Sequence, residues 1–131
     1  MLATAGIGIT PAAAILQDLA ARGSQRRVAA FHADRSAAAL TLADEVRAAV
    51  DALPQGELHL WLDSTADAPE GLDAREGRMD FSQAEVPQDA DVVLCGPLPF
   101  MQAVRSALIE AGVPATQIHY EIFGPDLWLA A

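Results

Sequence analysis

Two glycines and a proline near the start of the chain form the pattern with the clearest chemical meaning. The segment reads Ala3-Thr4-Ala5-Gly6-Ile7-Gly8-Ile9-Thr10-Pro11. Glycines separated by one residue let the backbone turn tightly, and they let a bulky anion approach amide groups that side chains would otherwise cover. We expect Thr10 to be the N-cap and Pro11 the first residue of the following helix. The pattern predicts a helix N-terminus directed at an anionic ligand, with candidate binding residues Gly6, Ile7, Gly8, Thr10 and Pro11.

This turn is a weak signal when taken alone, because many Gly-x-Gly turns only connect a strand to a helix. Its position strengthens the prediction, since an apolar start precedes it and an amphipathic run follows it, as a dinucleotide-binding fingerprint requires. The third glycine of the Rossmann fingerprint is missing, and Pro11 stands in its region. The standard form of the fingerprint is therefore not met.

The elements that would position this turn alternate between strands and helices. Hydrophobic runs predict a first strand of about four residues, and further strands at 27–33, 57–63, 91–95 and 117–123. Helical patterns cover 11–22 and about 37–53, and a third helix lies between Gly96-Pro97 and Gly112. This order predicts a Rossmann-like α/β fold, in which three layers surround a five-stranded parallel sheet of order 3-2-1-4-5.

Two parts of the chain depart from this regular alternation. Residues 64–88 are rich in Asp, Glu, Pro, Gly and Ala with little periodicity, so we expect a solvated excursion with a possible short element near 79–86. The first strand is short for a central strand that must be paired on both sides. We therefore expect residues 1–131 to be a single domain that is the C-terminal fragment of a longer protein.

In an open parallel sheet, ligands bind beyond the carboxyl ends of the strands, at the point where the strand order reverses. That point lies between the first strand and strand 91–95, so the glycine turn should face the segment Cys95-Gly96-Pro97 across one crevice. Gly96 would let the backbone approach a flat ring, and Cys95 would present a small, soft side chain at its edge. A merely buried thiol explains Cys95 equally well.

Asp34 and Arg35 follow the second strand, where Rossmann-type sites recognise the adenosine ribose. Arg35 could contact the ribose or a 2'-phosphate. Asp34 could accept a hydrogen bond from a ribose hydroxyl and would repel a phosphate, so the pair slightly favours NADH over NADPH. A solvated polar loop is an equally good interpretation of both residues.

The remaining polar residues indicate no further chemistry. His32 and His119 lie in strand patterns, where a hydrogen-bonded buried or edge histidine is the favoured interpretation. No spacing of residues predicts a metal site. No serine lies in the context of a nucleophile elbow, which disfavours a hydrolase triad.

Composition limits the class of protein. The 131 residues include 52% hydrophobic but only 5% aromatic residues, so the core must be mostly aliphatic. The formal net charge is -10, which argues against nucleic acid or an anionic membrane as a partner. The single cysteine excludes an internal disulfide. Without a long apolar run, we expect a cytoplasmic protein.

Four segments together indicate a family. They are Gly6-Ile7-Gly8-Ile9-Thr10-Pro11, Leu94-Cys95-Gly96-Pro97, Phe100-Met101 and His119-Tyr120-Glu121-Ile122-Phe123-Gly124-Pro125-Asp126. In this order the chain resembles the NAD(P)H-binding domain of ferredoxin reductase-like enzymes, and most closely that of the flavohaemoglobins. The resemblance covers nearly the whole chain, and the last segment is its most specific part.

The resemblance implies roles for particular residues. In this family the glycine loop holds the pyrophosphate and the nicotinamide side, and the Cys-Gly-Pro loop lies near the nicotinamide. Gly6, Gly8, Thr10, Pro11, Cys95, Gly96 and Pro97 match those positions. Phe123 matches the aromatic residue that lies against the flavin ring, and Glu121 lies beside the same site. Cys95, Glu121 and Phe123 are therefore the candidate catalytic residues. Asp34 stands where a small residue is expected.

The family resemblance also implies partners. Electrons would pass from NAD(P)H to FAD in an upstream domain and then to haem in a globin domain, supporting nitric oxide dioxygenation. The chain itself contains no flavin-binding motif and no globin segment, so we expect it to be inactive alone. An oxygenase reductase with an iron–sulfur partner is an alternative. A stand-alone, non-catalytic NADH-binding module is another.

Overall fold

A six-stranded parallel sheet forms the centre of the computed structural model, which describes residues 1–82 and 84–122. The sheet has the order β4-β3-β2-β1-β5-β6, and every neighbouring pair is parallel. The strands are β1 (Leu2–Ala5), β2 (Val28–Asp34), β3 (Gly56–Leu62), β4 (Ala74–Glu76), β5 (Val92–Cys95) and β6 (Ile118–Glu121).

The predicted parallel α/β architecture is confirmed, but the prediction of five strands in the order 3-2-1-4-5 is wrong. The additional strand is β4, which lies at the sheet edge next to β3, within the segment expected to be a solvated excursion. It pairs three residues, with Ala74 opposite Leu60. A strand of three residues is too short to show a detectable alternation. Its pairing also depends on a partner strand more than ten residues away in the sequence, which a local pattern does not reveal.

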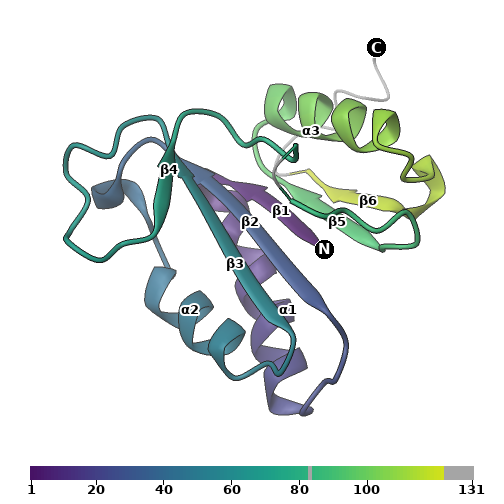
Figure 1. The fold of residues 1–131 in the computed structure, drawn as a ribbon, viewed down its shortest axis with the longest axis horizontal. Coiled ribbons are helices and arrows are strands. Elements are labelled where there is room, and N and C mark those ends of the chain that lie inside the picture. The colour runs from purple at the N-terminus through teal and green to yellow at the C-terminus, as the bar shows by residue number, and fades with distance from the viewer. Residues whose placement is uncertain (83, 123–131) are drawn as a thin grey trace.

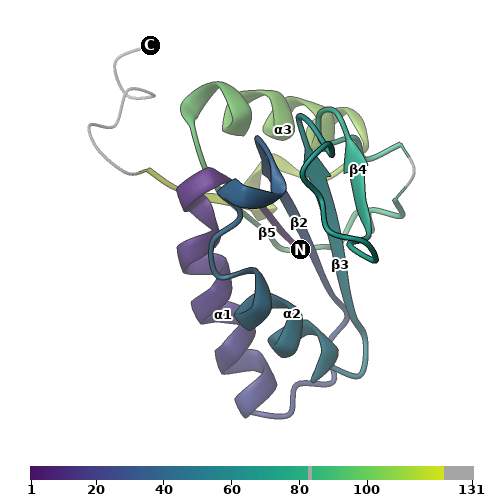
Figure 2. The ribbon, with the colours of Figure 1, turned by 90° about the vertical axis from the view of Figure 1, so that its left-hand side faces the viewer.

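Helices cover both faces of the sheet (Figures 1 and 2). The helices α1 (Ile9–Ala21) and α2 (Ala43–Asp51) lie on one face, and α3 (Leu98–Glu110) lies on the other. Three short 3₁₀ turns complete the described elements: η1 (Gly6–Gly8), η2 (Ala37–Ala39) and η3 (Ala115–Gln117). None of the described helices is long and apolar enough to cross a membrane. The cytoplasmic location stays a prediction.

The two faces of the sheet build two hydrophobic clusters because side chains alternate along each strand. Leu2, Val28 and Ala30 point toward α1 and α2, where they pack with Leu16 and Val50. The second cluster lies on the α3 side and contains Ala3, Phe31, Trp61, Val92, Leu94, Met101, Val104 and Leu108. The mainly aliphatic composition of these clusters is what the low aromatic content required.

The second predicted helix, 37–53, is only partly helical. A 3₁₀ turn covers Ala37–Ala39, the chain then extends, and α2 begins at Ala43 after Leu42 with a φ of 54°. The carboxylate of Asp67 accepts hydrogen bonds from the amides of Ala37 and Ala38, at 3.0 and 2.9 Å. These donors are satisfied by a distant carboxylate instead of by a helix, so the local pattern could not reveal the break.

Candidate functional site

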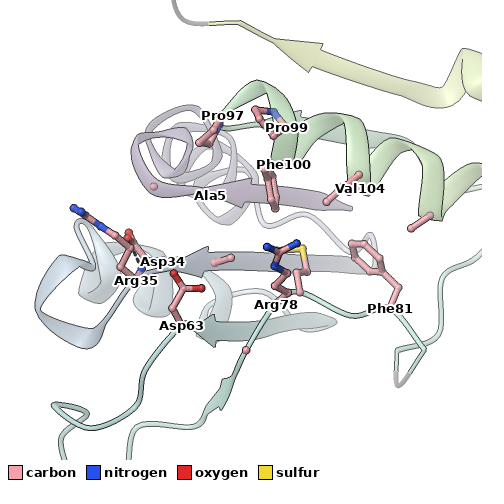
Figure 3. A pocket seen from close by; sticks show the side chains of 16 residues that line it. Ala5, Asp34, Arg35, Asp63, Arg78, Phe81, Pro97, Pro99, Phe100 and Val104 are labelled. Atoms are coloured by element: carbon pink, nitrogen blue, oxygen red, sulfur yellow. Dashed lines mark hydrogen bonds between the residues drawn. The ribbon is translucent and has the colours of Figure 1, made fainter.

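A cavity of about 560 Å³ opens at the carboxyl ends of β1, β2 and β3, on the face that α3 covers (Figure 3). Three parts of the chain line it. The ends of the strands contribute Ala5, Gly6, Ala33, Asp34, Arg35 and Asp63. The helix α3 and its N-cap contribute Pro97, Pro99, Phe100, Ala103, Val104 and Ala107, and residues 77–81 contribute Gly77, Arg78, Met79 and Phe81. The site therefore lies at the edge of the sheet that the strand order predicted.

The two glycines of the first turn have different roles. Gly6 has a φ of 53°, and no heavy atom lies within 4 Å of the position that a Cβ would take. It lines the cavity, so its backbone is open to a ligand. Gly8 is buried, and a Cβ there would collide with the backbone carbonyl of Cys95. Gly8 therefore lets the turn pack directly on the end of β5, which brings the two predicted loops together.

The predicted capping of the first helix is wrong. The helix begins at Ile9 after the 3₁₀ turn, and Gly8 is its N-cap. Thr10 is thus inside the first helical turn, where its hydroxyl donates to the carbonyl of Ile7 at 3.0 Å. Pro11 is the third helical residue, and its missing N–H falls among the unpaired donors of that turn. Ile7, Thr10 and Pro11 do not line the cavity, and Ile7 is 66% exposed.

The segment after β5 contacts the glycine turn mainly through its backbone. Cys95 is fully buried and does not line the cavity. Burial raises the pKa of its thiol, and the negative charge of Glu121 raises it further. A Cβ on Gly96 would lie 2.8 Å from Cδ1 of Phe100 and 3.2 Å from the amide nitrogen of Ala5. Pro97 is the N-cap of α3 and lines the cavity.

The two other candidate catalytic residues come from the end of the chain. Glu121 is the last residue of β6 and lies opposite Cys95 in the strand register, with its side chain exposed. Phe123 lies outside the described residues. The catalytic roles of Cys95, Glu121 and Phe123 stay predictions.

Asp34 and Arg35 both line the cavity where β2 ends (Figure 3). The side chain of Asp34 is only 9% exposed. Its Oδ1 accepts a hydrogen bond of 2.8 Å from the amide of Arg35. The exposed side chain of Arg35 makes no ion pair with the described residues. The hydrogen bond from the Arg35 amide thus fixes the carboxylate of Asp34 at the cavity wall.

Several lining residues were not identified from the sequence. Arg78 and Phe81 belong to the segment interpreted as a solvated excursion, and Asp63 directly follows β3. The ring of Phe81 packs edge-on against Phe31, with centroids 5.2 Å apart. The large apolar residues Met79, Phe81 and Val86, in a mostly polar segment, were the signal that this segment contacts the core. The excursion therefore forms one wall of the cavity.

A buried polar pair lies beneath this edge of the sheet. Nδ1 of His32 and Oγ1 of Thr4 are 2.8 Å apart, whereas Nε2 of His32 has no hydrogen-bond partner among the described residues and lies 3.7 Å from Oδ2 of Asp34. Burial lowers the pKa of His32, against the opposing effect of Asp34. The expected hydrogen-bonded histidine is thus confirmed at one ring nitrogen only. His119 lies on edge strand β6 with its side chain 62% exposed.

Within residues 1–82 and 84–122, no group of three His, Cys, Asp or Glu side chains could hold a metal ion.

Residues 1–106 match the family model of the oxidoreductase NAD-binding domain. The chain belongs to this family. A flavohemoprotein of Bordetella pertussis is 36% identical over 129 residues, which cover 95% of this chain and 32% of that protein. The chain thus spans about a third of the length of such relatives.

Two solved structures are also similar. The flavohemoglobin of Malassezia yamatoensis, determined with bound FAD and heme, is 38% identical, with a TM-score of 0.84 over 94% of this chain and 31% of that one. The flavohem-like FAD/NAD-binding domain of nitric oxide dioxygenase from Vibrio cholerae is 37% identical, with a TM-score of 0.81 over 95% of this chain and 50% of that one.

The cavity of this NAD-binding domain combines an apolar wall with charged groups of both signs (Figure 3). Carboxylates such as Asp34 and Asp63 accept hydrogen bonds from hydroxyl groups, and guanidinium groups such as those of Arg35 and Arg78 bind phosphate oxygens. Phe100 and Phe81 offer flat apolar surface for a ring. This arrangement suits a ligand that joins an aromatic base, a sugar and phosphate.

Proposed function

We propose that this chain is the nicotinamide-nucleotide-binding module of a flavohaemoglobin-type reductase, with residues 1–131 forming one domain at the C-terminal end of a longer flavoprotein. In that protein, hydride passes from NAD(P)H to FAD in a neighbouring domain, and electrons continue to the haem of a globin domain for nitric oxide dioxygenation. The observation that most supports this proposal is the cavity where the glycine turn, the end of β2 and the start of α3 meet.

The residues of the cavity fit the adenosine half of a dinucleotide. Gly6 leaves its backbone uncovered beside the cavity, so a phosphate can approach its amide without meeting a side chain. The carboxylate of Asp34 would accept a hydrogen bond from a ribose hydroxyl, and its charge would repel a 2'-phosphate. The proposal therefore includes a preference for NADH over NADPH.

The nicotinamide half would extend toward the contact between the glycine turn and the Cys95–Pro97 segment. When bound, the nicotinamide supplies the hydride, and the chain contributes only positioning. Gly8 and Gly96 keep the two loops in backbone contact. Cys95 would act from beneath this contact, because its thiol is buried. Glu121 and Phe123 complete the proposed site.

A pair of substitutions on α3 tests the nucleotide site. Ala103 is exposed and lines the cavity, whereas its neighbour Gln102 is exposed but does not line it. We expect Ala103→Phe to fill the cavity and to weaken NADH binding at least about tenfold, with Gln102→Phe close to wild type. Isothermal titration of the 131-residue chain with NADH measures both affinities. Equal affinities for the two variants, or no binding of NADH by the wild type, would contradict the proposal.

The gene upstream of the Met1 codon distinguishes the proposed parent protein from its alternatives. An in-frame flavin domain preceded by a globin supports the dioxygenase reading, and an in-frame ferredoxin would indicate an oxygenase reductase. A stop codon directly upstream would indicate a stand-alone NADH-binding module. The similarity to flavohemoproteins at 36 to 38% identity favours the first outcome.

A further inference from the structure

We propose that Thr4 and His32 are positioning residues for Asp34, and that this buried pair sets the preference of the domain for NADH over NADPH. The inference rests on the proposed function, because it needs Asp34 to face the ribose. It deepens that function by assigning a role to two residues that touch no ligand.

The pair is built into the centre of the sheet. Thr4 on β1 lies opposite His32 on β2 in the parallel register, and each residue is only 2% exposed. Oγ1 of Thr4 lies 2.8 Å from Nδ1 of His32 and 3.5 Å from the carbonyl oxygen of Phe31. A threonine and a histidine at neighbouring positions in a buried sheet are costly unless their polar atoms are paired. Their hydrogen bond therefore fixes both side chains.

The surroundings of Nε2 select the tautomer of His32. If Nδ1 carried the proton, the bare lone pair of Nε2 would face Oδ2 of Asp34 at 3.7 Å, and the two negative regions would repel each other. If the Thr4 hydroxyl donates to Nδ1, the proton lies on Nε2 and faces the carboxylate. The second arrangement avoids this repulsion, and the Thr4 hydroxyl then donates its hydrogen bond to Nδ1 at 2.8 Å in preference to the carbonyl of Phe31 at 3.5 Å. The pair thus presents an N–H group to Asp34 from below the cavity.

This N–H group faces the carboxylate from one side at 3.7 Å, while the amide of Arg35 forms a hydrogen bond with it from the other. The Arg35 amide donates to Oδ1 at 2.8 Å, and Nε2 of His32 faces Oδ2. Oδ2 accepts no hydrogen bond from the described residues, and Asp34 lines the cavity. Oδ2 therefore remains able to accept a ribose hydroxyl. A carboxylate with one oxygen held by a hydrogen bond and the other faced by a polarised N–H group discriminates a hydroxyl from a phosphate better than one that can rotate away.

Two substitutions of His32 test the roles of its two ring nitrogens separately. In His32→Asn the amide can replace Nδ1 and keep the bond to Thr4, but nothing faces Asp34. In His32→Gln the longer side chain can place its NH₂ group near the position of Nε2. The measured quantity is selectivity, defined as the Kd for NADPH divided by the Kd for NADH, from titrations of the 131-residue chain. Thermal unfolding of each variant reports its effect on stability separately.

We expect Asp34→Asn to lower the selectivity about tenfold, as loss of a hydrogen bond to a charged group implies. His32→Asn should lower it severalfold, and His32→Gln should restore most of it. Thr4→Val should also lower it, because the tautomer of His32 is then no longer fixed. In an Asp34→Asn background, His32→Asn should change the selectivity no further, since both substitutions act through one carboxylate.

The outcomes separate this inference from the proposed function. If the wild type binds neither nucleotide, the proposed function fails and the inference fails with it. If the wild type prefers NADH but His32→Asn keeps the wild-type selectivity, only the inference is overturned. Equal losses of affinity for both nucleotides, together with a lower unfolding temperature, would make His32 a structural residue and would also overturn it. Side-chain ¹⁵N spectra of the wild type must show the Nε2–H tautomer of His32.

Discussion

Two walls of the cavity are held in place by different interactions: the first is the glycine turn at the strand ends, and the second is the 64–88 segment. At the glycine turn, backbone packs on backbone, with Gly8 against the carbonyl of Cys95. In the 64–88 segment, exposed carboxylates of Asp67, Glu76 and Asp80 accept hydrogen bonds from nearby amides. Water competes for such exposed hydrogen bonds but cannot replace close backbone packing. The first wall is therefore intolerant of added atoms, and the second is sensitive to solution conditions.

The largest expected effect comes from Gly8→Val. Its Cβ would collide with the carbonyl of Cys95, and backbone atoms in a central strand cannot move aside cheaply. We expect the free energy of unfolding to fall by about 3 kcal/mol or more, measured by urea denaturation. Weak NADH binding by this variant would follow from its unfolding and would not report a direct contact.

Gly6→Ala is the matched control for that prediction. The position has open space for a Cβ, so only the left-handed φ of 53° disfavours alanine, at a cost of about 1 kcal/mol. Gly6→Ala should therefore fold and still bind NADH less tightly, because the methyl group covers backbone beside the cavity. A loss of stability as large as that of Gly8→Val would contradict the distinction between the two glycines.

The sequence predicted the first wall better because glycine and proline restrict the backbone locally. The positions of Gly6, Gly8, Gly96 and Pro97 were enough to predict that two loops meet at one edge of the sheet. The start of the helix was misjudged by two residues, since a 3₁₀ turn before Ile9 leaves no local signature.

The second wall depends on contacts between residues that are distant in the sequence. Phe81 reaches Phe31, and Asp67 reaches Ala37 and Ala38, over separations that no periodicity records. Both β4 and the break before α2 follow from such contacts, so both were missed. The segment nevertheless contributes Arg78 and Phe81 to the cavity.

An intermediate effect is expected for Phe81→Ala, which tests whether the second wall belongs to the nucleotide site. Phe81 is partly buried, so its loss should lower the free energy of unfolding by about 2 kcal/mol. Because it also lines the cavity, NADH binding should weaken severalfold in a titration. Leu72→Ala, in the same segment but away from the cavity, should leave the affinity unchanged. Wild-type affinity in Phe81→Ala would remove this segment from the site.

The smallest effects distinguish the two regions by pH. Hydrogen bonds from backbone amides lower the pKa values of Asp67, Glu76 and Asp80. The ordinary value is 3.8 for the two aspartates and 4.5 for the glutamate. The folded state therefore keeps these groups ionised where the unfolded chain binds protons. Their contribution to stability is present above about pH 4.5 and is lost as the pH falls further. Asp67→Asn should reduce the loss of stability in this acidic range.

The centre of the sheet should also lose stability on acidification, through His32, but its loss should begin at a higher pH than that of the exposed carboxylates. Burial lowers the pKa of His32 from its ordinary 6.5, so the unfolded chain takes up a proton that the folded protein resists. Stability should therefore be constant for this group above pH 6.5, should decline as the pH falls below that value, and should level off below the folded pKa. Urea unfolding between pH 7.5 and 5 measures the decline. The Met1 amino group also titrates in this range, because its pKa is lowered from an ordinary 8.0. The His32→Asn variant cannot bind a proton at the substituted side chain. Subtracting the pH dependence of its unfolding free energy from that of the wild type therefore isolates the contribution of His32. Identical slopes in the two proteins would mean that the centre of the sheet carries no such proton linkage, and that the pH sensitivity lies in the second wall alone.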